Sequence, residues 1–205
     1  DRCLAVDEMG KEIDGDQIMA VCAEYLTAQG KLKSEGFVAT VMSNLGLHKF
    51  CEENHLKLLC ASVGDRNVLE LMQKESMVLG GEQSGHMIFL EYATTGDGQL
   101  TALQILALLQ RSGKKASELF GSCARYPQVL INIPVSGGNA AKDAIMAADW
   151  LRDAVAQQEA ILGESGRILV RPSGTEALIR VMVEAQEEET AHSCAQILAD
   201  RIKCQ

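Results

Sequence analysis

The sequence lacks the features that mark membrane-spanning, disordered and disulfide-stapled proteins. No apolar run approaches the roughly 20 residues that a membrane-spanning helix needs, and proline occurs only 3 times in 205 residues. The 7 cysteines are odd in number and never spaced Cys-x-x-Cys, so they indicate neither a disulfide framework nor a zinc site. With 47% hydrophobic and 23% charged residues, the composition is typical of a globular protein.

Positive charge is also scarce. The formal net charge of -9 argues against non-specific binding to nucleic acid, because such binding needs an electropositive surface. The opening residues, DRCLAVDEMGKEIDGD, are acidic and contain no apolar segment of the kind found in signal peptides. We therefore expect a cytoplasmic protein without nucleic-acid or membrane partners, in which any anion is bound locally.

The first half of the chain alternates between helical and extended patterns. Apolar spacing predicts helices at 16–29, about 46–54 and about 65–75, with strands at 37–42 and 56–62 between them. Such alternation is typical of an α/β layer with mainly parallel strands. We expect this part to be an α/β/α domain.

A long helix and a candidate linker follow. The segment from Leu100 to Leu109 is apolar almost all round, which predicts a buried helix. Gly113, Gly121 and Pro127 then interrupt the chain, so we expect a linker at 113–124.

The rest of the chain, from residue 128 onward, shows a different order of predicted elements. It predicts a strand over 128–133, a long helix over 139–160, two strands around a loop, and a final helix. This β-α-β-β-α order indicates a smaller α+β domain, so the sequence predicts two domains.

The loop of this second domain reads Arg-Pro-Ser-Gly-Thr-Glu. Arg171 precedes it and Arg180 follows it, while Ser173 and Thr175 offer hydroxyl donors and Gly174 exposes backbone N–H groups. Arginine forks and clustered N–H groups suit a phosphate. The alternative is a tight hairpin turn with two surface arginines, because turn and phosphate-loop compositions overlap.

A second constellation lies in GGEQSGHMIF, residues 80–89. Glu82, Ser84 and His86 alternate, so in an extended segment their side chains face one way. A carboxylate and a hydroxyl suit the vicinal hydroxyls of a sugar, and a histidine can relay protons near neutral pH. The alternative is a polar turn whose histidine bonds only to backbone.

Five motifs occur in the order and spacing of the α-D-phosphohexomutases, which the sequence resembles over nearly its whole length. They are Asp1-Arg2, Val63-Gly64-Asp65-Arg66, Gly81-Glu82-Gln83-Ser84-Gly85-His86, Thr94-Thr95-Gly96-Asp97-Gly98 and Arg171-Pro172-Ser173-Gly174-Thr175-Glu176. The residues of these motifs are most similar to those of the bacterial members that interconvert glucosamine 6-phosphate and glucosamine 1-phosphate for cell-wall precursor synthesis.

The resemblance covers only the C-terminal portion of a four-domain family. It implies that residues 1–13 end the metal-loop domain, 14–112 form the sugar-recognition domain and 125–205 form the phosphate-binding domain. Asp1 would belong to a Mg²⁺ loop whose other carboxylates precede it. The catalytic phosphoserine loop has no counterpart here, so we expect a fragment that is inactive alone.

The resemblance also implies roles for single residues. Glu82 and Ser84 would bind hydroxyls of a hexosamine phosphate, His86 and Arg2 would act near the reacting oxygen, and Arg66 is a further candidate ligand. The phosphate that does not react would be held by one loop, made of Arg171, Ser173, Gly174, Thr175 and Arg180. The whole enzyme would work through a bisphosphorylated intermediate and could form a homodimer.

Two other interpretations stay open. One is a member of the same family that acts on mannose or glucose phosphates. The other is a non-catalytic module that binds sugar phosphates.

Overall fold

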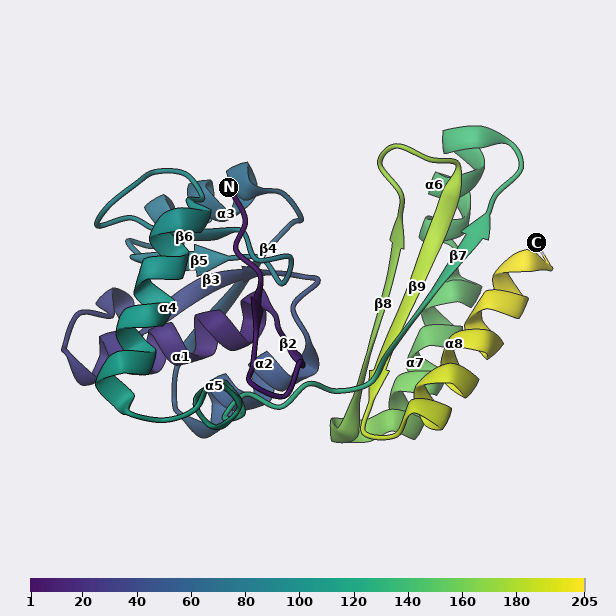
Figure 1. The fold of residues 1–205 in the computed structure, drawn as a ribbon. Coiled ribbons are helices and arrows are strands. Elements are labelled where there is room, and N and C mark those ends of the chain that lie inside the picture. The colour runs from purple at the N-terminus through teal and green to yellow at the C-terminus, as the bar shows by residue number, and fades with distance from the viewer. Residues whose placement is uncertain (205) are drawn as a thin grey trace. The chain divides into compact units, whose positions relative to one another are not determined.

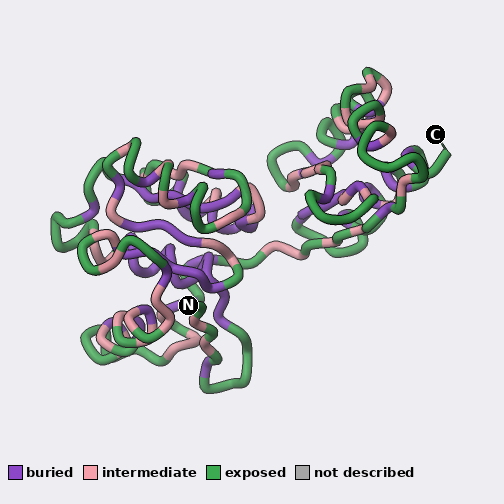
Figure 2. The backbone as a smooth tube through the Cα atoms, turned by 90° about the horizontal axis from the view of Figure 1, so that it is seen from above, coloured by how far each residue is buried: buried purple, intermediate pink, exposed green. Residues whose placement is uncertain are grey.

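The computed structural model describes residues 1–204 and divides the chain into two units. The first runs from Asp1 to Arg125 and the second begins at Tyr126 (Figure 1). Each unit has a hydrophobic core of its own, and the buried positions lie on some of its strands and on the helix faces that pack against them (Figure 2). No helix within residues 1–204 is long and apolar enough to cross a membrane.

The first unit contains a four-stranded sheet with helices on both faces. Its strand order is β4-β3-β5-β6, where β3 pairs in parallel with β4 and β5, and β6 is antiparallel to β5. The elements of this unit are β1 (Ala5–Val6), β2 (Glu12–Ile13), α1 (Gly15–Ala28), η1 (Lys33–Glu35), β3 (Gly36–Thr40), α2 (Leu45–Glu53), β4 (Lys57–Ala61), α3 (Asp65–Lys74), β5 (Leu79–Gly81), β6 (Met87–Phe89), α4 (Gly98–Ser112) and α5 (Ala116–Phe120).

Side-chain alternation along β3 explains the three layers. Phe37 and Ala39 belong to the cluster that α1, α2, α4 and α5 cover, whereas Val38 belongs to a separate cluster under α3. Because successive residues of a strand face opposite sides of the sheet, an uninterrupted apolar strand must be covered on both faces. The predicted α/β/α arrangement with mainly parallel strands is confirmed.

Helix α1 begins where the sequence places its polar cap. Asp14 accepts from the Gln17 backbone N–H at 3.1 Å, and the Gln17 side-chain oxygen accepts from the Asp14 N–H at 3.3 Å. This capping box satisfies two of the N–H groups that a helix start leaves without partners. The same Gln17 amide donates to the carbonyl of Phe120 at 3.0 Å and lies 3.4 Å from that of Cys123.

Those last contacts change the interpretation of the segment predicted as a linker. Residues 113–124 contain helix α5, and both Phe120 and Cys123 are buried in the core of the first unit. The breakers Gly113 and Gly121 flank α5 and end helices, but the chain stays packed between them. The boundary between the units falls after Arg125 instead.

Helix α4 is less buried than its composition predicts. Thr101, Ile105 and Leu108 are buried, but Leu103 is 65% exposed and Leu106 is 61% exposed. The helix packs with one face against α1 and α5, which leaves Leu103 and Leu106 on its exposed side. The expectation of burial all round was wrong.

The second unit is a three-stranded antiparallel sheet of order β7-β9-β8, with α7 and α8 packed against the strands. Its elements are β7 (Gln128–Pro134), α6 (Gly138–Ala147), α7 (Asp149–Leu162), η2 (Gly163–Ser165), β8 (Gly166–Pro172), β9 (Leu178–Ala185) and α8 (Glu188–Lys203). The predicted single helix over 139–160 is two helices, because Ala148 takes an extended conformation with ψ 135°.

The central strand β9 starts between two prolines. Pro134 ends β7 opposite Leu178, and Pro172 ends β8 opposite Ile179. Both outer strands therefore stop at the same end of the sheet, beside the loop over residues 173–177. The α+β character of this unit agrees with the sequence.

Candidate functional site

The turn between β5 and β6 presents the first group of candidate residues. Glu82 N–H donates to the His86 carbonyl at 2.9 Å, and Gly85, with φ 88°, donates back to the Glu82 carbonyl at 3.0 Å. The Glu82 carboxylate accepts from the Gly64 N–H at 2.9 Å and from the Ser84 hydroxyl at 3.2 Å. The turn thus joins two of the three residues predicted to converge, and it ties them to the start of α3.

His86 differs from the other two because it is 4% exposed. Its backbone bridges that of Arg2, and its Nε2 lies 4.0 Å from an Asp1 carboxylate oxygen. A Cβ at Gly96 would overlap the imidazole, so glycine is required there for the ring to fit. Within residues 1–204 the buried Nε2 has no hydrogen-bond partner. The hydrogen-bonding capacity of this nitrogen is therefore unused among the described residues.

The predicted metal contribution is limited to Asp1. Residues 1–204 contain no group of three or more His, Cys, Asp and Glu side chains arranged to hold a metal ion. The Asp1 side chain is 71% exposed. These residues alone therefore do not fit a complete Mg²⁺ site, because Mg²⁺ takes near-octahedral oxygen coordination.

Arg66 lies on the first turn of α3 and is engaged by a neighbour. Its Nε contacts a Glu70 oxygen at 2.8 Å, and its side chain is 87% exposed. The Glu70 hydrogen bond and charge raise the pKa of Arg66. This is the geometry of a solvent-exposed i,i+4 helix pair, and it uses one of the five N–H donors of the guanidinium.

The loop between β8 and β9 brings two arginines together. Arg171 and Arg180 are paired across the strands. Arg180 donates to Glu176 at 2.9 Å, whereas Arg171 has no ion-pair partner in the described part of the chain. Burial, and secondarily the Arg180 charge, lower the pKa of Arg171. Like charges directly opposite each other destabilise a sheet, so this pair is suited to an added anion.

Ser173 organises the loop from inside. It is 4% exposed, its N–H donates to the Leu178 carbonyl at 2.9 Å, and its Oγ accepts from the Glu176 N–H at 3.2 Å. Thr175 is exposed, and a Cβ added at Gly174 would meet no atom within 4 Å. The open backbone at Gly174 and the Thr175 hydroxyl are therefore accessible, while Ser173 mainly holds the turn.

Lys142 supports the loop and was not predicted from the sequence. It is 4% exposed, and its Nζ donates to the carbonyls of Ser173 at 2.8 Å and Glu176 at 2.9 Å. A buried ammonium is retained only where such acceptors compensate its desolvation. A single lysine inside a helix predicted by apolar spacing gave no signal, because its partners are backbone oxygens 31 and 34 residues away.

Two family models match this chain. Residues 14–126 match the α/β/α domain III of the phosphoglucomutase/phosphomannomutase family, and residues 130–201 match the C-terminal domain of the same family.

Curated relatives match the whole chain. A phosphoglucosamine mutase of Ligilactobacillus salivarius is 48% identical over 205 residues, which are 100% of this chain and 45% of the relative. One of Geobacillus kaustophilus is 48% identical over 99% of this chain and 44% of its own length. The chain thus spans less than half the length of these relatives.

Solved structures share the fold at low identity. An N-acetylphosphoglucosamine mutase of Aspergillus fumigatus superimposes with a TM-score of 0.81 at 20% identity, covering 98% of this chain and 45% of that one. The same fungal enzyme in complex with GlcNAc-6P and magnesium gives 0.79 at 19% identity, over 98% of this chain and 49% of that one. The solved structures show the shared fold, and the two domain models show that the chain belongs to the phosphoglucomutase/phosphomannomutase family.

Proposed function

We propose that this chain is the sugar- and phosphate-recognition portion of an enzyme that interconverts glucosamine 6-phosphate and glucosamine 1-phosphate. The observation that carries the proposal is the pairing of Arg171 with Arg180, in which only Arg180 has a carboxylate partner among the described residues. A phosphate would compensate that surplus of positive charge. The relatives at 48% identity that are named phosphoglucosamine mutase support the choice of sugar.

In the second unit, the phosphate would bind at the open side of the 173–177 loop. The Arg171 guanidinium supplies a fork of donors, and the exposed Thr175 hydroxyl and the Gly174 N–H supply two more. Arg180 would divide its donors between the phosphate and Glu176, which it already contacts. Ser173 would act chiefly by fixing the loop, because its own side chain is buried.

In the first unit, Glu82 and Ser84 would bind sugar hydroxyls. One Glu82 oxygen is held by the Gly64 N–H and the other by the Ser84 hydroxyl, so the carboxylate is already oriented. The His86 Nε2 would hold or transfer a proton at a substrate oxygen, as a buried imidazole without an internal partner can do. Arg2 would offset charge on the transferring phosphoryl group, and Arg66 is a further ligand candidate.

The whole enzyme would use Mg²⁺, which neutralises charge on the transferring phosphoryl group when bound. Asp1 would supply one oxygen ligand, and the remaining ligands would come from outside residues 1–204. We therefore expect this chain to bind sugar phosphates weakly and to have no mutase activity alone. For the whole enzyme we propose a cytoplasmic homodimer.

Titration calorimetry on the 205-residue chain tests the proposal. Glucosamine 6-phosphate should bind more tightly than unphosphorylated glucosamine, and Arg171→Ala should weaken the sugar phosphate at least about tenfold, which corresponds to ~1.4 kcal/mol. Arg201→Ala, an exposed arginine on α8, is the matched control and should leave affinity unchanged. Equal affinity for the phosphorylated and free sugar would refute the phosphate-binding loop.

A second titration tests the sugar assignment. Glucosamine 6-phosphate should bind more tightly than mannose 6-phosphate or glucose 6-phosphate, and Glu82→Ala should reduce the difference. If mannose or glucose phosphate binds better, or if a whole-length enzyme turns either over faster, the glucosamine assignment is wrong, although the family assignment stands.

A further inference from the structure

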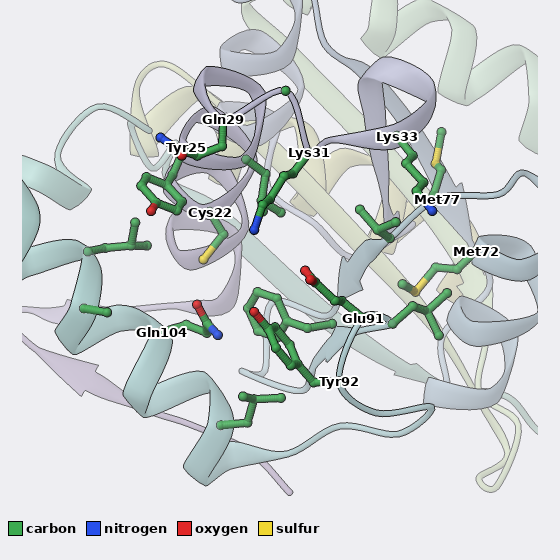
Figure 3. Close-up of a pocket in the computed structure, with 18 of the residues that line it drawn as sticks. Cys22, Tyr25, Gln29, Lys31, Lys33, Met72, Met77, Glu91, Tyr92 and Gln104 are labelled. Atoms are coloured by element: carbon green, nitrogen blue, oxygen red, sulfur yellow. The ribbon is translucent and has the colours of Figure 1, made fainter.

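The first unit contains a hollow of about 1040 Å³ that neither candidate loop uses. It lies between the C-terminal half of α1, helix α4, and the residues that follow β6 (Figure 3). Pockets for organic ligands are usually about 300–1,000 Å³. The hollow therefore has room for a small organic molecule.

The hollow is separate from the turn of Glu82 and His86. It opens where β5 begins and β6 ends, at the Leu79–Phe89 pair, whereas the turn joins the other ends of the same two strands. At about 3.3 Å per residue, the two ends of this hairpin are roughly 10 Å apart. A ligand in the hollow would not occupy the sugar-binding turn.

The accessible wall of the hollow is largely apolar. Leu103 is 65% exposed and Tyr92 is 57% exposed, and the half-buried Tyr25 and Leu100 line the hollow beside them. Aromatic rings offer a large apolar face to a guest. This wall suits an aromatic or aliphatic body.

The rim carries charged side chains, and two of them, Lys31 and Glu91, point into the hollow. Figure 3 shows the Lys31 ammonium and the Glu91 carboxylate pointing into the hollow from different sides. Within residues 1–204 neither side chain forms an ion pair. Lys33 and Arg111 add two further cations, and Arg111 is held over the Tyr25 ring, 5.4 Å from its centre, and bonded to its hydroxyl. Cations outnumber the carboxylate.

We propose that this hollow binds an organic anion, with its acidic group at Lys31 and its apolar body against the Leu103 and Tyr92 side chains. The three cations of the rim outnumber its one carboxylate, which favours a negatively charged guest over a neutral or positive one. The preferred class is therefore an aromatic or aliphatic carboxylate or sulfonate, which differs from the phosphorylated hexose of the proposed function. The inference does not depend on that function.

The anionic dye 8-anilinonaphthalene-1-sulfonate is a suitable probe, titrated against the 205-residue chain with the dye excited in its own absorption band. Ala107→Trp would fill the hollow from α4 and should abolish saturable binding. Ala102→Trp is the matched control, because Ala102 lies on the same helix but does not line the hollow. Thermal melting of both variants checks that they fold. Binding that survives Ala107→Trp would overturn the proposal.

Charge variants test the acidic group. Lys31→Glu should weaken dye binding by ~3-fold or more and Glu91→Gln should strengthen it, as expected for partly exposed charges. Lys11→Glu, an exposed lysine that does not line the hollow, controls for net charge. The affinity for the neutral dye Nile red should be the same in Lys31→Glu, in Glu91→Gln and in the unsubstituted chain. Equal anionic-dye affinity in all of these variants would overturn selection for an anion.

Two further measurements distinguish this site from the 82–86 turn and the 173–177 loop, which the proposed function assigns to the sugar phosphate. Arg171→Ala should leave dye affinity unchanged, and excess glucosamine 6-phosphate should not displace the dye. Displacement by the sugar phosphate would show that the dye and the sugar phosphate bind at the same site. That result would overturn the proposal of a separate site, whether or not the proposed function holds.

Discussion

Arg171 and Arg180 lie directly opposite each other on β8 and β9, yet only Arg180 has a carboxylate partner within residues 1–204. The unliganded sheet therefore carries a repulsion that a bound phosphate would relieve. Binding and stability should be linked through this pair, because a ligand that binds only the folded state stabilises it.

Arg171→Ala should separate these two effects. The substitution removes like-charge repulsion of about 0.2–1 kcal/mol between opposite strand positions but also removes some packing by the arginine stem. We expect the free energy of unfolding to change by less than about 0.5 kcal/mol, while the rise in melting temperature on adding inorganic phosphate disappears. Urea unfolding measures the first quantity, and thermal melting with and without phosphate measures the second. A phosphate-induced rise that persists in the variant would contradict the assignment of Arg171.

Lys142 should control the shape of the 173–177 loop. Lys142→Met removes a buried charged donor from two carbonyls, and we expect a loss of about 2 kcal/mol in unfolding free energy together with weaker phosphate binding. Lys142→Arg should recover part of both. Leu151→Ala, in the hydrophobic core of the same unit, should cost ~2–5 kcal/mol without changing the affinity of the folded protein. If Lys142→Met leaves affinity intact, the lysine is only a stability residue.

Substitution by alanine should destabilise the protein at Gly96 but have little effect at Gly174. In Gly96→Ala the new methyl group would overlap the His86 ring, so we expect a loss of about 1–3 kcal/mol and a displaced imidazole. Gly174→Ala meets no atom within 4 Å and should change stability by less than ~1 kcal/mol. Thermal melts and histidine NMR signals measure these effects. A neutral Gly96→Ala would contradict the close packing on His86.

The cysteines should fall into two classes of reactivity. Burial raises the pKa of Cys22 to about 12 and, with smaller charge contributions, that of Cys51 to about 12, whereas Cys60 and Cys204 are exposed. At pH 8 a thiol reagent should modify Cys60 and Cys204 quickly, and Cys22 and Cys51 only after unfolding, because the thiolate is the reactive form. Mass spectrometry of peptides from the labelled protein identifies the sites. Rapid labelling of Cys22 would contradict the core packing.

The same thiols give a pH dependence of stability. Their ordinary pKa is 9.0, and the folded state raises it, so the unfolded chain releases these protons first as pH increases. Their contribution is complete below about pH 9 and is lost progressively towards pH 12. Urea midpoints should therefore fall over that range, and Cys22→Ala should reduce the slope. A flat profile would contradict the prediction.

The residues that the sequence identified were those whose chemistry is local. Glu82 and Ser84 are two residues apart and contact each other within a turn, not in the extended segment that was predicted, and Arg171 and Arg180 flank one loop. Closeness in the sequence was therefore enough to group each pair. Lys142 escaped this approach, because its role depends on distant backbone carbonyls.

Boundaries that depend on packing were harder to predict. Helix α6 ends and α7 begins around Ala148, which is neither a glycine nor a proline. The apolar spacing continues across this point, so no signal in the sequence marks the break. Similarly, the composition of α4 could not distinguish a helix enclosed on all sides from one that leaves Leu103 and Leu106 exposed. In both cases tertiary contacts decide, and a local pattern does not record them.

The prolines that end β7 and β8 have a consequence for association between copies of this chain. Pro134 and Pro172 lack the N–H group that a neighbouring strand would need, so the sheet resists extension by a strand added beside the end of β7 or β8. Exposed sheet edges otherwise promote aggregation. The prolines thus protect the end of the sheet that carries the 173–177 loop against pairing with another strand.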